Sequence, residues 1–167
     1  MWTDWYIYYG NNKGGDNEKQ RLRRKQADDG KECDMVSQTR VDHVLNMAGS
    51  STRDFNCWGA TMFIEQAKDR LGWVENQEIG EWLQDNYLPI DKAKVQQGDI
   101  LALFDRDEVA KCLHLVHTAV CIGGGRYVHK IGQNKAQTDN LRGVLQHYAF
   151  CGNSYAFMRL KGEQNED

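Results

Sequence analysis

One cysteine and two histidines, far apart in the sequence, have the residue types and order of a nucleophile with its base. Cys57 lies in FNCWGATMFI, where it begins a predicted helix. His117 follows in the apolar run LHLVHTAVCI, and His129 follows in RYVHK. Free N–H groups and the positive end of the helix dipole favour a thiolate at a helix start. We therefore expect a primed Cys57 with one histidine as base and the other as its orienter.

The two histidines flank a glycine turn that predicts their relative position. GGG at 123–125 offers the positive φ angles of a tight hairpin. A three-residue loop there places His129 opposite Ala119 and makes His117 and His129 diagonal neighbours on one face, roughly 7–8 Å apart at the backbone. A two-residue loop would place them on opposite faces.

Two alternatives apply to the histidine strand. A histidine among apolar neighbours is often a satisfied core residue. Cys112, His114 and His117 also offer three zinc ligands. Regular strand alternation puts Leu115 and His117 on one face and Cys112 and His114 on the other, so we predict no metal site and no cofactor.

Helical spacing precedes strand-like runs, which indicates an α+β fold. Short helices are predicted at 40–48 and 78–86. A longer helix is predicted from Cys57 to Leu71, with Gly72 as its C-cap. The later part of the chain contains short β-type runs separated by turns, which predict an antiparallel sheet: QQGDILALF, CLHLVHTAVCI, RYVHKIG and SYAFMRL.

The 167-residue chain is predicted to contain an N-terminal extension, one domain and a short tail. Residues 1–50 form the N-terminal extension. Within it, 1–9 are aromatic and strand-like, and 10–39 read as a solvated helix or mobile arm. The aromatic start is a possible surface for a protein partner, although burial against the sheet is the simpler expectation. The catalytic domain is predicted at 51–162 and the tail at 163–167.

Composition limits the partners and the compartment. A net charge of −3 gives no reason to expect nucleic acid, and no segment has the roughly 18 apolar residues of a membrane span. No signal peptide is visible, so we expect a cytoplasmic protein or one exported by a specialised secretion system. The five cysteines are a poor disulfide framework, and only a Cys121–Cys151 bridge is left open.

Three motifs in order resemble the NlpC-type cell-wall cysteine peptidases, a branch of the papain-like superfamily. They are the helix-start cysteine in NCWGATMF, the Gly-Asp turn opening a strand in QQGDILALF, and the histidine hairpin HTAVCIGGGRYVHK. The resemblance covers about 54–160. It implies a papain-like, NlpC-like α+β fold in which the helix-start cysteine packs on an antiparallel β-sheet.

The resemblance also implies roles for individual residues. Cys57 is expected to be the nucleophile, His117 the base and His129 the orienting residue. The expected reaction cleaves an amide bond in a peptide or peptidoglycan fragment. Asn56 and Trp58 flank the cysteine where the family has other residues, and we expect both to contact substrate.

Two further functions fit the same residues. Papain-like bacterial toxins share the Asn-Cys-Trp start, and such an effector deamidates or acyl-transfers on protein glutamine. A non-catalytic binding protein could also keep this fold without turnover.

Overall fold

The computed structural model describes 36–47, 54–107, 109, 112–149 and 154–162, together with the backbone of a short strand at 6–7. Several sequence predictions therefore lie outside the described residues. They concern most of the aromatic N-terminus, the arm up to residue 35, the tail at 163–167 and the Cys121–Cys151 bridge.

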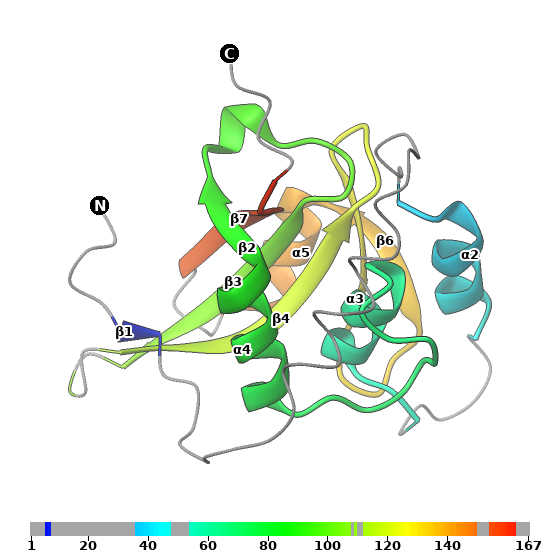
Figure 1. The fold of residues 1–167 in the computed structure, drawn as a ribbon, viewed down its shortest axis with the longest axis horizontal. Coiled ribbons are helices and arrows are strands. Elements are labelled where there is room, and N and C mark those ends of the chain that lie inside the picture. Colours follow the sequence, from blue (N-terminus) through cyan, green and yellow to red (C-terminus); the bar gives the residue numbers. More distant parts are fainter. Residues whose placement is uncertain are drawn as a thin grey trace.

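A single seven-stranded sheet forms the centre of the fold (Figure 1). Its strands run in the order β2-β7-β3-β4-β5-β6, all paired antiparallel, and β1 pairs with β4 in parallel. The mixture of helices with an antiparallel sheet agrees with the α+β prediction. The elements are β1 (Tyr6–Ile7), α2 (Gln38–Asn46), α3 (Cys57–Ile64), α4 (Asn76–Asn86), β2 (Tyr87–Ile90), η1 (Lys92–Lys94), β3 (Ile100–Asp107), β4 (Cys112–Cys121), β5 (Arg126–Lys130), β6 (Ala136–Asn140), α5 (Leu141–His147) and β7 (Ser154–Leu160).

The helices pack on both faces of the sheet (Figure 1). Apolar residues of α3 and α4 cover one face, and those of α5 cover the other. The sequence analysis missed α5 together with strands β2 and β6. Strand β2 contains Pro89 and forms an edge of the sheet, where a residue without an N–H group is tolerated. No helix in the described part of the chain is long and apolar enough to cross a membrane.

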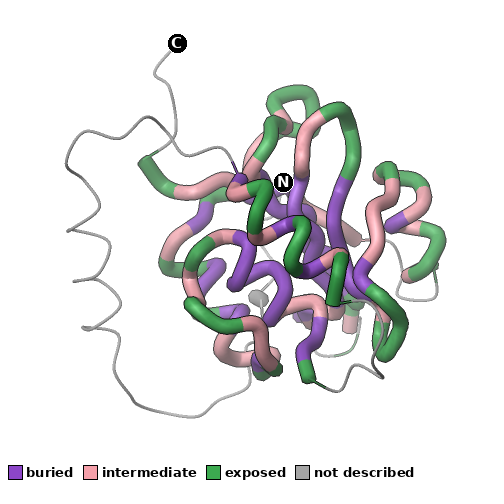
Figure 2. Tube along the Cα trace, turned by 90° about the vertical axis from the view of Figure 1, so that its right-hand side faces the viewer, coloured by how far each residue is buried: buried purple, intermediate pink, exposed green. Residues whose placement is uncertain are grey.

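Buried residues follow the centre of the sheet and the helix faces that touch it (Figure 2). Val120 and Val128 face α2 and α3, whereas Ala119 and Tyr127 face α5. Sides alternate between neighbouring residues of this hairpin as the pleat requires. The sheet is thus buried on both faces around the histidine hairpin.

The three-residue hairpin loop is confirmed. Gly123, Gly124 and Gly125 all have positive φ, and Ile122 N–H donates to the carbonyl of Arg126 at 2.9 Å. Val120 pairs with Val128 and Cys121 with Tyr127, which is the predicted register. Continuing that register places His129 on the face that also carries Tyr127.

The strand alternation predicted around His117 is wrong, because β3 and β4 contain a β-bulge. Leu103 pairs with His117, but the next residue, Phe104, pairs with Leu115, so Val116 has no opposite residue. Leu115 therefore faces α4, whereas His117 faces α5. Asn76 Nδ2, at the start of α4, donates to the Leu115 carbonyl at 2.6 Å beside the bulge.

Helix α3 ends at Ile64 rather than near Leu71. Gln66 has a φ of 60°, which ends the helical path. Arg40 Nη1 then donates to the carbonyls of Phe63 and Lys68 at 2.7 Å each and satisfies backbone groups exposed by this ending. Gly72 is not a helix cap, and its carbonyl instead lies against Gly59 of α3.

The Gly-Asp turn before β3 has a structural role. Gly98 has a φ of 94°, and Asp99 is buried with its carboxylate accepting from Arg159 Nε and Nη2 at 2.9 Å each. Gln96 N–H donates to the same carboxylate at 2.7 Å. The paired hydrogen bonds between Arg159 and Asp99 thus link the start of β3 to β7.

Gly59→Ala is expected to destabilise the protein. A Cβ at Gly59 would lie 1.7 Å from the Gly72 carbonyl oxygen, so the backbone must move. We expect the free energy of unfolding to fall by about 1–3 kcal/mol despite the better helix propensity of alanine. Gly72→Ala is the matched control, because its Cβ meets nothing within 4 Å. Equal urea midpoints for the two variants would contradict the close approach.

Candidate functional site

Asn56 fixes the start of α3 and so positions Cys57. Its Oδ1 accepts from Gly59 N–H at 2.9 Å and Val74 N–H at 3.3 Å, and its Nδ2 donates to the Val74 carbonyl at 2.7 Å. An asparagine cap of this kind satisfies free N–H groups of the first turn. Cys57 begins the helix as predicted, while both polar atoms of the Asn56 side chain are bonded within the protein.

Backbone N–H groups surround the Cys57 thiol. Those of Thr118, Trp58 and Cys57 itself hydrogen-bond to the sulfur, and each lowers the pKa of the thiol. The Lys130 ammonium, fully buried between the Phe55 ring and the Gly132 carbonyl, also lowers it. Burial acts in the opposite direction and is the largest effect, raising the pKa of Cys57 to about 11.

The expectation of a primed thiolate is therefore wrong for the resting protein. Cys57 is half-buried beneath the surrounding side chains, and this burial favours the uncharged thiol more than the N–H groups and Lys130 favour the anion. At neutral pH the resting Cys57 is a thiol.

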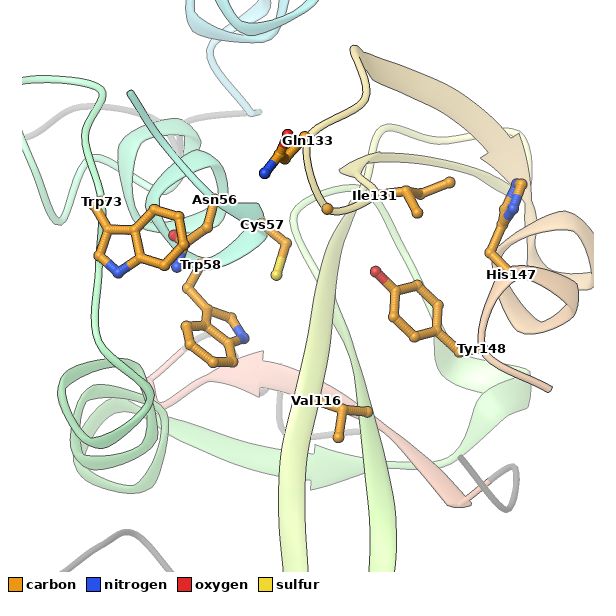
Figure 3. A pocket seen from close by; sticks show the side chains of 10 residues that line it. Asn56, Cys57, Trp58, Trp73, Val116, Ile131, Gln133, His147 and Tyr148 are labelled. Carbon is orange, nitrogen blue, oxygen red and sulfur yellow. The ribbon is translucent and has the colours of Figure 1, made fainter. Parts of the chain in front are cut away.

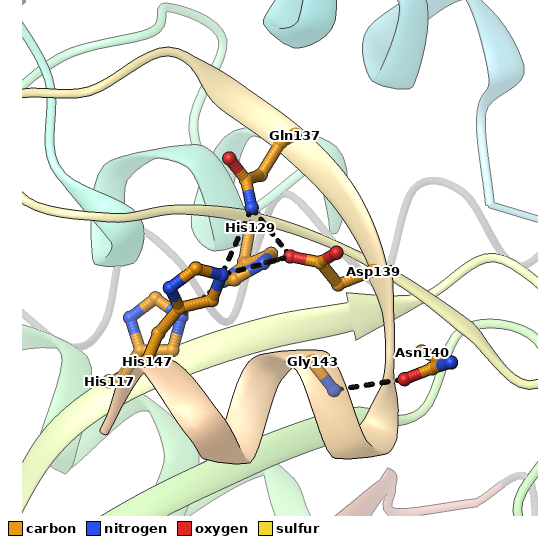
Figure 4. A network of polar contacts seen from close by, with 7 residues as sticks. All are labelled: His117, His129, Gln137, Asp139, Asn140, Gly143 and His147. Atoms are coloured by element: carbon orange, nitrogen blue, oxygen red, sulfur yellow. Dashed lines mark hydrogen bonds and ion pairs between the residues drawn. The ribbon is translucent and has the colours of Figure 1, made fainter. Parts of the chain in front are cut away.

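His117, His129 and Asp139 form a linear series of hydrogen bonds, which we call the relay (Figure 4). His117 Nε2 lies 3.0 Å from His129 Nδ1, and His129 Nε2 lies 3.0 Å from Asp139 Oδ2. The prediction that the two histidines meet is confirmed. Asp139, at the end of β6, was not predicted, because its strand was not recognised in the sequence.

The relay fixes the tautomer of each histidine. The Asp139 carboxylate only accepts hydrogen bonds, so His129 Nε2 carries a proton. The neutral His129 ring then has a lone pair on Nδ1, and His117 Nε2–H donates to it. His117 in turn has a lone pair on Nδ1, which is buried and has no hydrogen-bond partner among the described residues.

Two further side chains lie close to Asp139 Oδ2. Gln137 Nε2 donates to it at 2.5 Å, and His147 Nε2 of α5 lies 3.4 Å away. Gly143 in the first turn of α5 leaves room for this carboxylate, since a Cβ there would lie 3.1 Å from it. Hydrogen bonding to His129 is the largest influence on the carboxyl group and lowers its pKa.

Burial keeps both histidines of the relay neutral. The His117 ring is fully buried, with Tyr148 stacked on it at 4.2 Å between centroids and 22° between planes. Its pKa lies well below the usual value, chiefly because burial disfavours the cation. Burial also lowers the pKa of His129, although Asp139 opposes that shift.

Thr118 joins the helix to the histidine strand. Its hydroxyl hydrogen-bonds to that of Thr61 in α3 at 2.8 Å, and its N–H group bonds to the Cys57 sulfur. Cys57 therefore lies next to Thr118, the residue that follows His117 in β4. The thiol and His117 Nδ1 do not hydrogen-bond to each other in this structure.

A pocket of about 710 Å³ opens over Cys57 (Figure 3). Trp58 and Trp73 line it on the side of α3, and Tyr148 lines it on the side of α5. Trp58 Nε1 is buried without a hydrogen-bond partner among the described residues. The remaining lining residues are Asn56, Val116, Ile131, Gly132, Gln133 and His147.

The zinc hypothesis built on Cys112, His114 and His117 fails at His117, because that side chain belongs to the relay. The predicted strand alternation, which placed His117 on the opposite face from Cys112 and His114, is nevertheless wrong. The bulge places His117 on the same face of β4 as Cys112 and His114, and it is distance along the strand that separates them.

Comparisons with known proteins include a weak structural similarity to a solved structure. The chain resembles a solved NlpC/P60 family protein from Bacillus cereus, with a TM-score of 0.47 and 18% sequence identity. The alignment covers 77% of this chain and 41% of that protein. No protein-family model matches the sequence, and no curated protein is significantly similar to it.

The alkylation rate of Cys57 is expected to keep rising with pH well above neutrality. Only the thiolate reacts, and a pKa of about 11 makes the thiolate fraction increase about tenfold per pH unit up to that value. Iodoacetamide labelling from pH 6 to 10, followed by peptide mass spectrometry, measures the rate at Cys57 alone. A plateau below pH 8 would show a primed thiolate instead.

Proposed function

We propose that the protein is a cysteine hydrolase that cleaves an amide bond. Cys57 is the nucleophile, His117 the base and His129 the residue that orients it. The supporting observation is the His117 ring, whose Nε2–H is donated to His129 while its Nδ1 lone pair has no partner among the described residues. A base needs such a lone pair, held in one tautomer next to a nucleophile.

In the proposed mechanism both reactive groups begin neutral. Cys57 Sγ turns toward His117 Nδ1 and transfers its proton as it attacks the substrate carbonyl carbon. Such contacts are often longer in the free enzyme than in the complex with substrate. The carbonyl oxygen becomes an oxyanion, and in this proposal the N–H groups of Cys57 and Trp58 at the helix start stabilise it.

The second half of the reaction returns the enzyme to its resting state. The amide C–N bond breaks as the proton on His117 Nδ1 moves to the leaving nitrogen, leaving a thioester on Cys57. Water then gives its proton to His117 and attacks the thioester carbon. The carboxylic acid leaves as the sulfur recovers the proton.

The relay supports the charge that forms on His117. Burial disfavours an imidazolium ion, so the positive charge must be offset from within the protein. His129 accepts the hydrogen bond from His117 Nε2 and passes the polarisation to the Asp139 carboxylate. The orienting residue His129 is thus hydrogen-bonded to a carboxylate, that of Asp139, which the sequence analysis did not identify.

A peptidoglycan peptide is the substrate class that the motif order suggests. The pocket lining supplies a further restriction, because its described residues include no lysine, arginine, aspartate or glutamate. We propose that the part of the substrate bound over Cys57 is uncharged and contacts Trp58 and Tyr148 through apolar groups.

Deamidation of protein glutamine is the second candidate function. Trp73 lines the pocket while remaining 56% exposed, so it offers an apolar contact at the rim to a large partner. The same thiol chemistry on a side-chain amide would release ammonia rather than a peptide.

Cys57→Ala is expected to abolish turnover without unfolding the protein, whereas His129→Ala is expected to retain more activity. The two substrate classes are separated by mass spectrometry of digested peptidoglycan and by ammonia release from glutamine-containing proteins. Cys121→Ala is the control, because this thiol lies in the core on β4 away from the pocket. Full activity in Cys57→Ala would refute the nucleophile, and inactivity of the parent protein on both classes would favour a binding protein.

Asp139→Asn is expected to lower kcat by roughly 10²-fold. The amide can still accept from His129, but its lost charge no longer raises the pKa of that histidine. The acid limb of the kcat/KM profile should therefore move to lower pH. Asp85→Asn, at an exposed position on α4, is the matched control. An unchanged rate and pH profile in Asp139→Asn would remove Asp139 from the mechanism.

A further inference from the structure

We propose that the far end of the β3–β4 hairpin binds a zinc-class divalent ion through Cys112, His114 and Asp107. This site is separate from the pocket and independent of the proposed hydrolase activity. Ligand atoms of the three side chains all lie within 4.8 Å of one another.

The register of the hairpin brings these residues together. Asp107 pairs with Cys112, and Asp105 pairs with His114. Directly opposite residues share a face of the sheet, as do residues two apart along a strand. The bulge lies before Asp105 and does not disturb this alternation. All four side chains are therefore on one face.

The separation of the ligand atoms suits a tetrahedral ion. Cys112 Sγ lies 3.3 Å from His114 Nε2. With Zn–S near 2.3 Å and Zn–N near 2.0–2.1 Å, tetrahedral coordination sets the S···N separation at about 3.5 Å. A shift of a few tenths of an ångström would make the two groups ligands of one ion.

The donor set selects the kind of metal. Thiolate and imidazole favour zinc and similar borderline ions over magnesium and calcium, which take oxygen ligands. Cys112 is 6% exposed, whereas His114 and Asp107 are half-buried, so the ion would be held at the surface with one side open. The exposed Asp105, opposite His114, is placed to supply a fourth ligand or to bond to a bound water.

The position indicates a structural effect of binding. Cys112 is about 16 Å along β4 from His117, at about 3.3 Å per residue, so an ion there does not reach the relay. Cys112 also pairs with Tyr6 of β1. Metal binding would fasten β3 to β4 where β1 joins the sheet, and would stabilise the folded chain by mass action.

The test uses the full chain, freed of metal with a chelator and then titrated with Co²⁺ and with Zn²⁺. We expect one Co²⁺ per chain with a thiolate-to-cobalt charge-transfer band, displacement by Zn²⁺, and a higher melting temperature with Zn²⁺. Bound Zn²⁺ should also protect Cys112 from alkylation, as mapped by peptide mass spectrometry.

Variants separate this site from the thiol in the pocket. Cys112→Ser should lose the charge-transfer band, and His114→Ala should weaken binding by more than about 100-fold. Cys57→Ser should bind as the parent does. His114→Ala also serves if Cys112→Ser does not fold. A charge-transfer band that persists in Cys112→Ser, or that disappears in Cys57→Ser, would overturn the proposal, as would the absence of any band in the parent protein.

Discussion

The carboxylate of Asp139 is the group on which the arrangement of the candidate site depends. It can only accept hydrogen bonds, and it thereby decides which nitrogen of His129 carries a proton. That choice passes to His117, whose outer nitrogen is left as a base. Gly143 and the Asn140 cap bring α5 close to this carboxylate, and Tyr148 at the end of α5 covers His117. Through its contacts with His129 and His147, and through His129 with His117, this carboxylate thus connects β6 to β5, β4 and α5.

Burial, rather than the electrostatic field of the helix start, determines which groups of the resting site carry protons. The field of the helix start alone would favour a thiolate at Cys57. Three N–H groups and Lys130 favour the Cys57 thiolate, yet loss of solvent keeps the thiol protonated. The same loss keeps His117 neutral. A neutral pair avoids the cost of a cation on the fully buried His117 until a substrate can accept the new bond. The relay then matters most in the transition state, when His117 becomes charged.

Local sequence explained the hairpin well, because three consecutive glycines determine both the loop and the pairing of Val120 with Val128. Long-range contacts were not accessible in the same way. Helix α3 ends where Arg40, from another helix, donates to the carbonyl of Phe63 in the last turn and to that of Lys68 beyond it. Asp139 was missed because AQTDN contains a single β-branched residue, Thr138, and no aromatic residue, so it gives little indication of a strand, and β6 is formed by pairing with β5.

The bulge at Val116 shows how one extra residue changes the chemistry of a strand. With regular pairing, His117 would share the face of Leu115 and point toward α4, away from His129 and Asp139. The bulge turns it to the α5 face, which Cys112 and His114 also share. Leu115 keeps its place in the core beside α4, and its carbonyl bonds to Asn76. The two ends of β4 can therefore present Cys112, His114 and His117 on one face while Leu113, Leu115 and Val120 pack on the other, an arrangement that strict alternation from Leu113 onward would not permit.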